Sequence, residues 1–102
     1  MDLTKSQWKE KLSTDEDALI IDVRTQAEVN EGYIPNMLHI DIYNAALFME
    51  RAREMDPSKS YYIYCRSGIR SGQACAILRA MGFEKTYNLM GGFIDWDGDK
   101  TV

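Results

Sequence analysis

Apolar runs and amphipathic stretches alternate along the chain, and the two patterns predict different elements. The run from Ala18 to Val23 is apolar except for Asp22, which is typical of a strand covered on both faces, as in a parallel sheet. Shorter runs that are rich in β-branched, aromatic and other apolar residues predict further strands at 38–40, 61–64 and 86–89. The sequence therefore predicts strands that are separated by long connections.

Helical patterns fill those connections. Thr4 followed by Gln7 is a capping box, which predicts a helix to about residue 13 that covers one edge of the sheet. A second box, Thr25 with Glu28, predicts a short helix that ends before Gly32. Two longer stretches also have apolar residues at helical spacing; they cover residues 43–55 and 70–81. This alternation argues for a single α/β domain over residues 1–102, with a mostly parallel sheet.

Composition excludes several classes of partner. The formal net charge is -4, and nucleic acid is not an expected partner because phosphate contacts need a basic face. No apolar span of membrane length and no signal region is apparent, so we expect no membrane association. Two cysteines are too few for a disulfide framework, which points to the reducing cytoplasm. No cofactor and no metal site is expected.

The most informative segment is a thiol loop between a predicted strand and a predicted helix. It reads Cys65-Arg66-Ser67-Gly68-Ile69-Arg70. At such a junction backbone N–H groups and the positive end of the helix dipole favour a negative sulfur. Arg66 and Arg70 are candidate cations, and Gly68 can adopt a positive φ that lets the backbone wrap closely around the sulfur. The loop therefore predicts a nucleophilic Cys65 that binds anions.

Other reactive side chains have structural explanations. Cys75 on the following helix is interpreted as a packed thiol, with a resolving cysteine as the alternative. The single histidine, His39, is expected to be structural rather than the partner of a catalytic thiol. Arg24 is expected to pair with Asp22, Glu28 or another acid, and the alternative is that it completes a positive pocket. The tyrosines of the third predicted strand are expected in the core: Tyr61, Tyr62 and Tyr64.

Together these motifs resemble the rhodanese family, which moves sulfane sulfur through a persulfide on a loop cysteine. The matching segments are Asp22-Val23-Arg24 with Glu28, Gly32-Tyr33-Ile34-Pro35, the thiol loop, and Gly91-Gly92 followed by Trp96. The resemblance implies a three-layer α/β/α sandwich whose mostly parallel sheet has about five short strands. It also implies fold-supporting roles for Asp22 and Arg24.

The same resemblance implies a ping-pong sulfurtransferase. Cys65 would accept sulfur, and the N–H groups of the loop residues that follow would hold the outer sulfur; these residues are Arg66, Ser67, Gly68, Ile69 and Arg70. The two arginines would attract a small anionic donor such as thiosulfate, and cyanide or a thiol, small or on a protein, would be the acceptor. No cofactor is implied.

The chain departs from the family pattern at two places. Tyr33 replaces the usual histidine of a Gly-His-Ile turn, and Asn36-Met37 replaces the usual Gly-Ala pair. The segment after Trp96 is also short. These departures predict a rearranged turn and weaker anchoring of the C-terminal segment, but neither involves Cys65.

Two other functions use the same kind of loop. One is a non-enzymatic persulfide carrier or interaction module, in which Cys65 holds sulfur for a partner protein. The other is a cysteine-based phosphatase or arsenate reductase, which also places a thiolate in an N–H cradle. Four residues separate Cys65 from Arg70, whereas the tyrosine phosphatases and related phosphatases of this fold have five, and this favours the sulfurtransferase.

Overall fold

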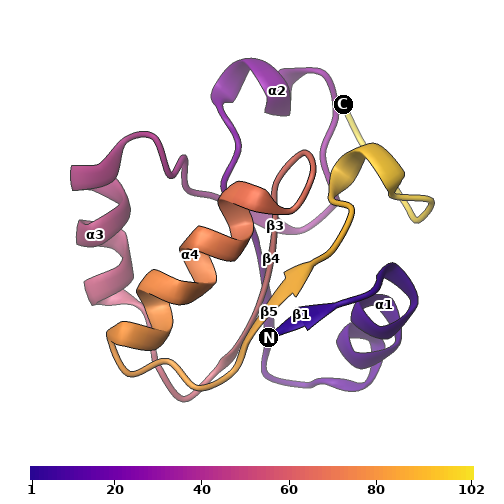
Figure 1. The fold of residues 1–102 in the computed structure, drawn as a ribbon. Coiled ribbons are helices and arrows are strands. Elements are labelled where there is room, and N and C mark those ends of the chain that lie inside the picture. Colours follow the sequence, from indigo (N-terminus) through magenta and orange to yellow (C-terminus); the bar gives the residue numbers. More distant parts are fainter.

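A five-stranded sheet with every neighbouring pair parallel forms the centre of the computed structural model, which describes residues 1–102 (Figure 1). The strands are β1 (Asp2–Leu3), β2 (Ala18–Asp22), β3 (Met37–His39), β4 (Ser60–Tyr64) and β5 (Thr86–Leu89). Their spatial order is β1-β5-β4-β2-β3, so β4 lies at the centre. The expected parallel α/β architecture is confirmed, because parallel neighbours require a crossover between consecutive strands.

One helix occupies each of these crossovers. The α-helices are α1 (Lys5–Thr14), α2 (Gln26–Asn30), α3 (Ala45–Glu54) and α4 (Ile69–Ala80), and the short 3₁₀ helix η1 (Phe93–Asp95) follows β5. Both predicted capping boxes are present: Thr4 accepts a hydrogen bond from the Gln7 N–H, and Thr25 accepts one from the Glu28 N–H. Local sequence signals therefore fix the starts of α1 and α2. None of the helices is long and apolar enough to cross a membrane.

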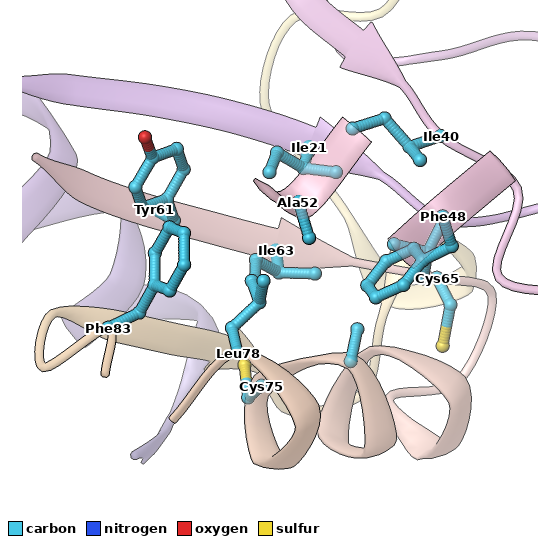
Figure 2. Close-up of a cluster of buried hydrophobic side chains, with 12 residues drawn as sticks. Ile21, Ile40, Phe48, Ala52, Tyr61, Ile63, Cys65, Cys75, Leu78 and Phe83 are labelled. Carbon is cyan, nitrogen blue, oxygen red and sulfur yellow. The ribbon is translucent and has the colours of Figure 1, made fainter. Parts of the chain in front are cut away.

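Alternating residues of β4 divide the core into two clusters. Tyr61 and Ile63 pack toward α3 and α4, as Figure 2 shows, whereas Tyr62 and Tyr64 face the opposite side. All four side chains are almost completely buried, which confirms the tyrosines as core residues. Since α3 and α4 cover one face of the sheet and α1 the other, the fold has three layers (Figure 1).

Helix α1 lies at the predicted edge of the sheet, over β5 and the edge strand β1, but it packs on one face there rather than only along the edge. Trp8 of α1 is fully buried, and its ring meets those of Tyr62 and Trp96 edge-on. Its indole N–H also donates a hydrogen bond to the Tyr87 carbonyl at 3.1 Å. A large aromatic side chain that finds a partner for its polar atom favours a buried face over an edge. Trp8 therefore anchors α1 against a face of the sheet.

The edge strand that pairs with β5 is β1, which the sequence pattern does not predict. Its two residues are too few to show a period, and Asp2 and Leu3 acquire their strand geometry only by pairing with Asn88 and Leu89. The N-terminal ammonium donates a hydrogen bond to the Thr86 carbonyl at 2.8 Å, which fixes the same edge.

The turn that departs from the family pattern contains the one non-glycine residue with a positive φ. Asn36 has a φ of 69°, in the left-handed region that glycine favours and asparagine tolerates. Tyr33 forms an antiparallel bridge with Thr101, with two N–H to carbonyl hydrogen bonds of 2.9 Å. The C-terminal segment is therefore attached to this turn through the backbone of Tyr33, and weaker anchoring than in relatives stays a prediction.

Candidate active site

Cys65 lies immediately beyond β4, at the carboxyl end of the central strand. Its side chain is fully buried and points toward the first turn of α4, beside Phe48 of α3 (Figure 2). Ligands of open parallel sheets bind beyond the carboxyl ends of the strands, where the helices that follow also begin. The topology therefore places the thiol where the sheet, α3 and the N-terminus of α4 meet.

The start of α4 surrounds the sulfur with hydrogen-bond donors. The Gly68 N–H donates to Cys65 Sγ at 3.1 Å, and Ser71 Oγ lies 3.3 Å from the same sulfur. Gly68 is the N-cap residue of the 12-residue helix and has a φ of 101°, as its position in the loop predicted. Burial opposes ionisation, but hydrogen bonds from Ser71, Gly68 and Ser67 outweigh it and lower the pKa of Cys65 below its ordinary value. The site therefore favours a thiolate.

The paired glycines after β5 allow the segment that follows them to form hydrogen bonds with the backbone of the thiol loop. Phe93 N–H donates to the Cys65 carbonyl at 2.8 Å, and Ile94 N–H donates to the Arg66 carbonyl at 3.1 Å. Gly92 has a φ of 63°, and a β-carbon there would overlap the Arg66 carbonyl group. Gly92 is therefore required both by its backbone conformation and by the close approach of the two segments.

The two loop arginines have different environments. Arg70 forms a bidentate ion pair with Glu28 of α2, at 2.7 and 2.8 Å, and its guanidinium lies 5.4 Å from the Tyr43 ring centre. The hydrogen bonds from Arg70 lower the pKa of Glu28 to about 2 despite partial burial. Arg66 is exposed. Of the two candidate cations, Arg66 is therefore exposed, whereas Arg70 is paired with a carboxylate that is distant in the sequence.

A cavity of about 270 Å³ lies beside Arg66. It is lined by Arg24, Glu28, Glu31, Arg66, Phe93, Ile94 and Lys100. Arg66 and Lys100 provide positive charge at its wall, and Ile94 is mostly exposed. Three larger cavities, of about 410, 550 and 370 Å³, are lined by other residues that do not include the thiol loop. Of these four cavities, the 270 Å³ cavity alone includes a residue of the thiol loop, Arg66, and Cys65 itself does not line it.

The residues interpreted as structural occupy structural positions. Arg24 and Asp22 form a buried ion pair at 2.8 Å, and the Tyr64 hydroxyl donates to Asp22 Oδ2 at 2.7 Å. His39 Nε2 lies 2.6 Å from the Arg24 carbonyl oxygen, so the histidine forms a hydrogen bond with the backbone and not with the thiol. Cys75 is buried, and that burial raises the pKa of its thiol to about 11. The structural interpretations of Arg24, His39 and Cys75 are confirmed.

Sequence reasoning missed two polar residues next to the thiol. Ser71 is fully buried and Asn88 nearly so, and the Ser71 hydroxyl lies within hydrogen-bond distance of Asn88 Oδ1. Helical spacing in the sequence could have shown that Ser71 is buried. Ser71 lies three residues before Ala74 and seven before Leu78, on the buried side of α4. A serine at such a position requires a polar partner inside the fold.

Comparisons with known proteins agree with this arrangement. A family model described as "Rhodanese-like domain" matches residues 4–99. A protein of Allochromatium vinosum named "Sulfurtransferase" is 38% identical over 95 residues, which cover 93% of this chain and 86% of that protein. "Thiosulfate sulfurtransferase GlpE" of Coxiella burnetii is 36% identical over 80 residues, covering 78% of this chain and 72% of that protein.

Solved structures show the same fold. A crystal structure of a rhodanese-like domain protein from Staphylococcus aureus superposes with a TM-score of 0.80 at 33% identity, covering 96% of this chain and 91% of that one. The family model matches residues 4–99, so the similarity includes β2 to β5, the thiol loop and the segment after β5.

Proposed function

The chain belongs to the rhodanese-like family, and from that premise we propose that it is a sulfurtransferase whose Cys65 carries sulfane sulfur as a persulfide. The observation that carries the proposal is the thiol's position at the N-terminus of α4, where Gly68 and Ser71 lie within 3.1 and 3.3 Å of Sγ. Donors in this arrangement stabilise a thiolate without a histidine partner. Thiosulfate is the proposed donor class, because a relative with 36% identity is named for it.

In the first half-reaction the Cys65 thiolate attacks the outer sulfur of thiosulfate. The electron pair of Sγ forms the new S–S bond, and sulfite leaves with the pair of the bond that breaks. The outer sulfur of the persulfide then carries the negative charge, and we assign its stabilisation to the N–H groups of residues 66–70 and the dipole of α4. The exposed Arg66 attracts the anionic donor to the thiol loop.

Arg70 acts differently from Arg66 in this proposal. Its ion pair with Glu28 holds the loop against α2 and reduces its attraction for a donor anion. The hydrogen bonds to Glu28 are the main reason that the pKa of Arg70 is raised, and electrostatic attraction to Cys65 adds a smaller contribution. We therefore assign Arg70 to shaping the loop and stabilising the thiolate, and Arg66 to donor capture.

In the second half-reaction an acceptor nucleophile attacks the outer sulfur and Cys65 leaves as a thiolate. Cyanide or a small thiol fulfils this role, and a thiol on a partner protein is the second acceptor class. Exposed apolar side chains next to the loop favour that second class: Ile69 is 71% exposed, Ile94 59% and Tyr43 69%. Such residues commonly mark protein contacts when they gather at a site. A protein acceptor would make the chain a persulfide carrier with slow turnover of small substrates.

The test is the intact-protein mass after incubation with thiosulfate. We expect the wild type to gain one sulfur atom and to lose it on cyanide treatment, with release of thiocyanate. Cys65→Ser should show no gain. The matched variant Cys75→Ser should load like the wild type, because burial raises the pKa of the Cys75 thiol to about 11, whereas the pKa of Cys65 is lowered. Failure of the wild type to load with thiosulfate, mercaptopyruvate or polysulfide would refute the sulfurtransferase. Hydrolysis of an aryl phosphate that depends on Cys65 would instead support a phosphatase.

A further inference from the structure

A chain of polar groups connects the reactive sulfur with the edge of the sheet. Ser71 Oγ lies 3.3 Å from Cys65 Sγ and also contacts Asn88 Oδ1. Asn88 Nδ2 donates to Asp2 Oδ1 at 2.9 Å and to the Gly68 carbonyl at 3.0 Å. Ser71 is fully buried and Asn88 is 5% exposed, so these groups exchange hydrogen bonds mainly with one another.

The orientation of the Asn88 amide follows from its partners. Its two N–H groups face two acceptors, the Asp2 carboxylate and the Gly68 carbonyl. Flipping the amide would place Oδ1 against both of these oxygens, which would be repulsive and would leave both without donors. Asn88 Oδ1 must therefore face Ser71 and act as an acceptor.

Ser71 consequently has one hydroxyl proton and two competing acceptors. When Cys65 is a thiolate, the negative sulfur is the better acceptor, since hydrogen bonds to ionised groups are the stronger ones. When Cys65 carries a second sulfur, Sγ is bonded on both sides and has no charge, so the Asn88 carbonyl oxygen is the better acceptor. The preferred direction of the hydroxyl therefore depends on the state of the sulfur.

We propose that Asn88 is a positioning residue that holds the Ser71 hydroxyl proton while Cys65 carries sulfur, and that Ser71 turns to Sγ as the thiolate leaves. This proposal rests on the proposed persulfide chemistry. During discharge the acceptor's electron pair forms a bond to the outer sulfur, and the pair of the broken S–S bond returns to Sγ. Ser71 stabilises that new charge by a hydrogen bond and transfers no proton. The Ser71 and Asn88 pair therefore assists the release of sulfur from Cys65 rather than the loading of sulfur onto Cys65.

Asn88 also contacts the loop backbone, and the test must separate the effect of this contact from the effect that acts through Ser71. By binding the Gly68 carbonyl it also supports the N-cap residue whose N–H donates to the sulfur. The charged groups near the site are Arg70, which pairs with Glu28 from α2, and Asp2 from β1. None of these groups changes when Ser71 is replaced, so a Ser71 variant isolates the hydroxyl.

The first measurement compares the two half-reactions in Ser71→Ala. A Cys75→Ala background leaves one thiol, and its ionisation is followed by ultraviolet thiolate absorbance. Loading by thiosulfate and discharge by cyanide are then timed in single turnovers at one common pH, at least one unit above the higher of the two Cys65 pKa values, so that both variants meet the same fraction of cyanide anion. We expect discharge to slow about tenfold, the effect of one charge-assisted hydrogen bond, while loading changes less than about twofold. Equal slowing of both steps, or no slowing of discharge, would overturn the proposal.

The second measurement tests Asn88 itself. Asn88→Leu removes the competing acceptor, so it should shift the Cys65 pKa downward more when Ser71 is present than in Ser71→Ala. Comparing the two backgrounds cancels any effect that acts through Gly68. Equal shifts in the two backgrounds would show that Asn88 does not act through Ser71, and Asn88→Ala repeats the comparison if the leucine variant unfolds. Wild type that fails to load sulfur refutes the proposed function, whereas loading with no Ser71 effect refutes only this inference.

Discussion

The ion pair between Glu28 and Arg70 joins helix α2 to the thiol loop across 42 residues of sequence. Its contribution can be tested with Glu28→Gln, which removes the charge but keeps an oxygen able to accept the Thr25 N–H bond of the capping box. The side chains of Glu28 and Arg70 are 25% and 16% exposed, so solvent screens their attraction only partly. This variant therefore measures the attachment of the loop with little disturbance of α2.

The magnitude follows from the pKa of Glu28, which falls from 4.5 to about 2 on folding. At about 1.4 kcal/mol per pKa unit this corresponds to an upper limit of about 3 kcal/mol, and partial exposure reduces the expected loss to about 1–2 kcal/mol. Because the folded-state pKa is depressed, the stabilisation is complete above pH 4.5 and disappears as the pH falls toward 2.

Urea unfolding of wild type and Glu28→Gln between pH 7 and pH 3 measures this contribution. We expect the variant to be less stable at pH 7, and more than half of the difference to be gone at pH 3. Glu31→Gln is the matched control, since Glu31 is the C-cap residue of the same helix and is exposed, and it should change stability by less than about 0.5 kcal/mol. Equal stability of wild type and Glu28→Gln at pH 7, or a difference that does not change with pH, would refute the reasoning.

Three further perturbations test other parts of the structure. Gly92→Ala should destabilise the fold by about 3 kcal/mol or more in urea unfolding, because its β-carbon would overlap the Arg66 carbonyl group. The control Gly82→Ala also has a positive φ, of 101°, but its β-carbon would meet open space, so it should cost only about 1 kcal/mol. Equal losses of stability in the two variants would contradict this account. Trp8→Ala should cost about 3–5 kcal/mol, whereas a helix lying at the sheet edge would lose much less. Arg66→Ala should raise KM for thiosulfate several-fold, make KM less dependent on salt concentration, and leave the unfolding stability unchanged. An unchanged KM would show that Arg66 does not capture the donor.

Features that depend on neighbouring residues were predictable from the sequence. The capping boxes at Thr4 and Thr25 form within one turn of helix, and the positive φ of Gly68 follows from a strand that turns directly into a helix. The tyrosines of β4 were assigned to the core because aromatic residues on a strand normally pack there, and burial of the whole strand confirms it.

Features that depend on distant partners were not predictable in the same way. Arg70 reads as a free cation in the loop, and only the fold brings Glu28 within 2.7 Å of it. The strand β1 exists because β5 provides backbone partners, and its own two residues carry no periodic signal. Ser71 and Asn88 are 17 residues apart, and their contact depends on α4 packing against β5. Sequence patterns located the thiol, but the groups that tune it come from other segments.

The thiol loop is therefore supported from three directions, and each support acts on a different property. Glu28 of α2 holds Arg70, the segment after Gly92 binds the carbonyl groups of Cys65 and Arg66, and Asn88 of β5 binds the carbonyl of Gly68. Only the third support also contacts a group beside the sulfur, through the Ser71 hydroxyl. Loss of the first two should lower stability and loosen the loop, affecting both half-reactions, whereas loss of the Ser71 hydroxyl should separate loading from discharge. Measuring stability and the two half-reactions together therefore distinguishes residues that hold the loop from those that assist sulfur release.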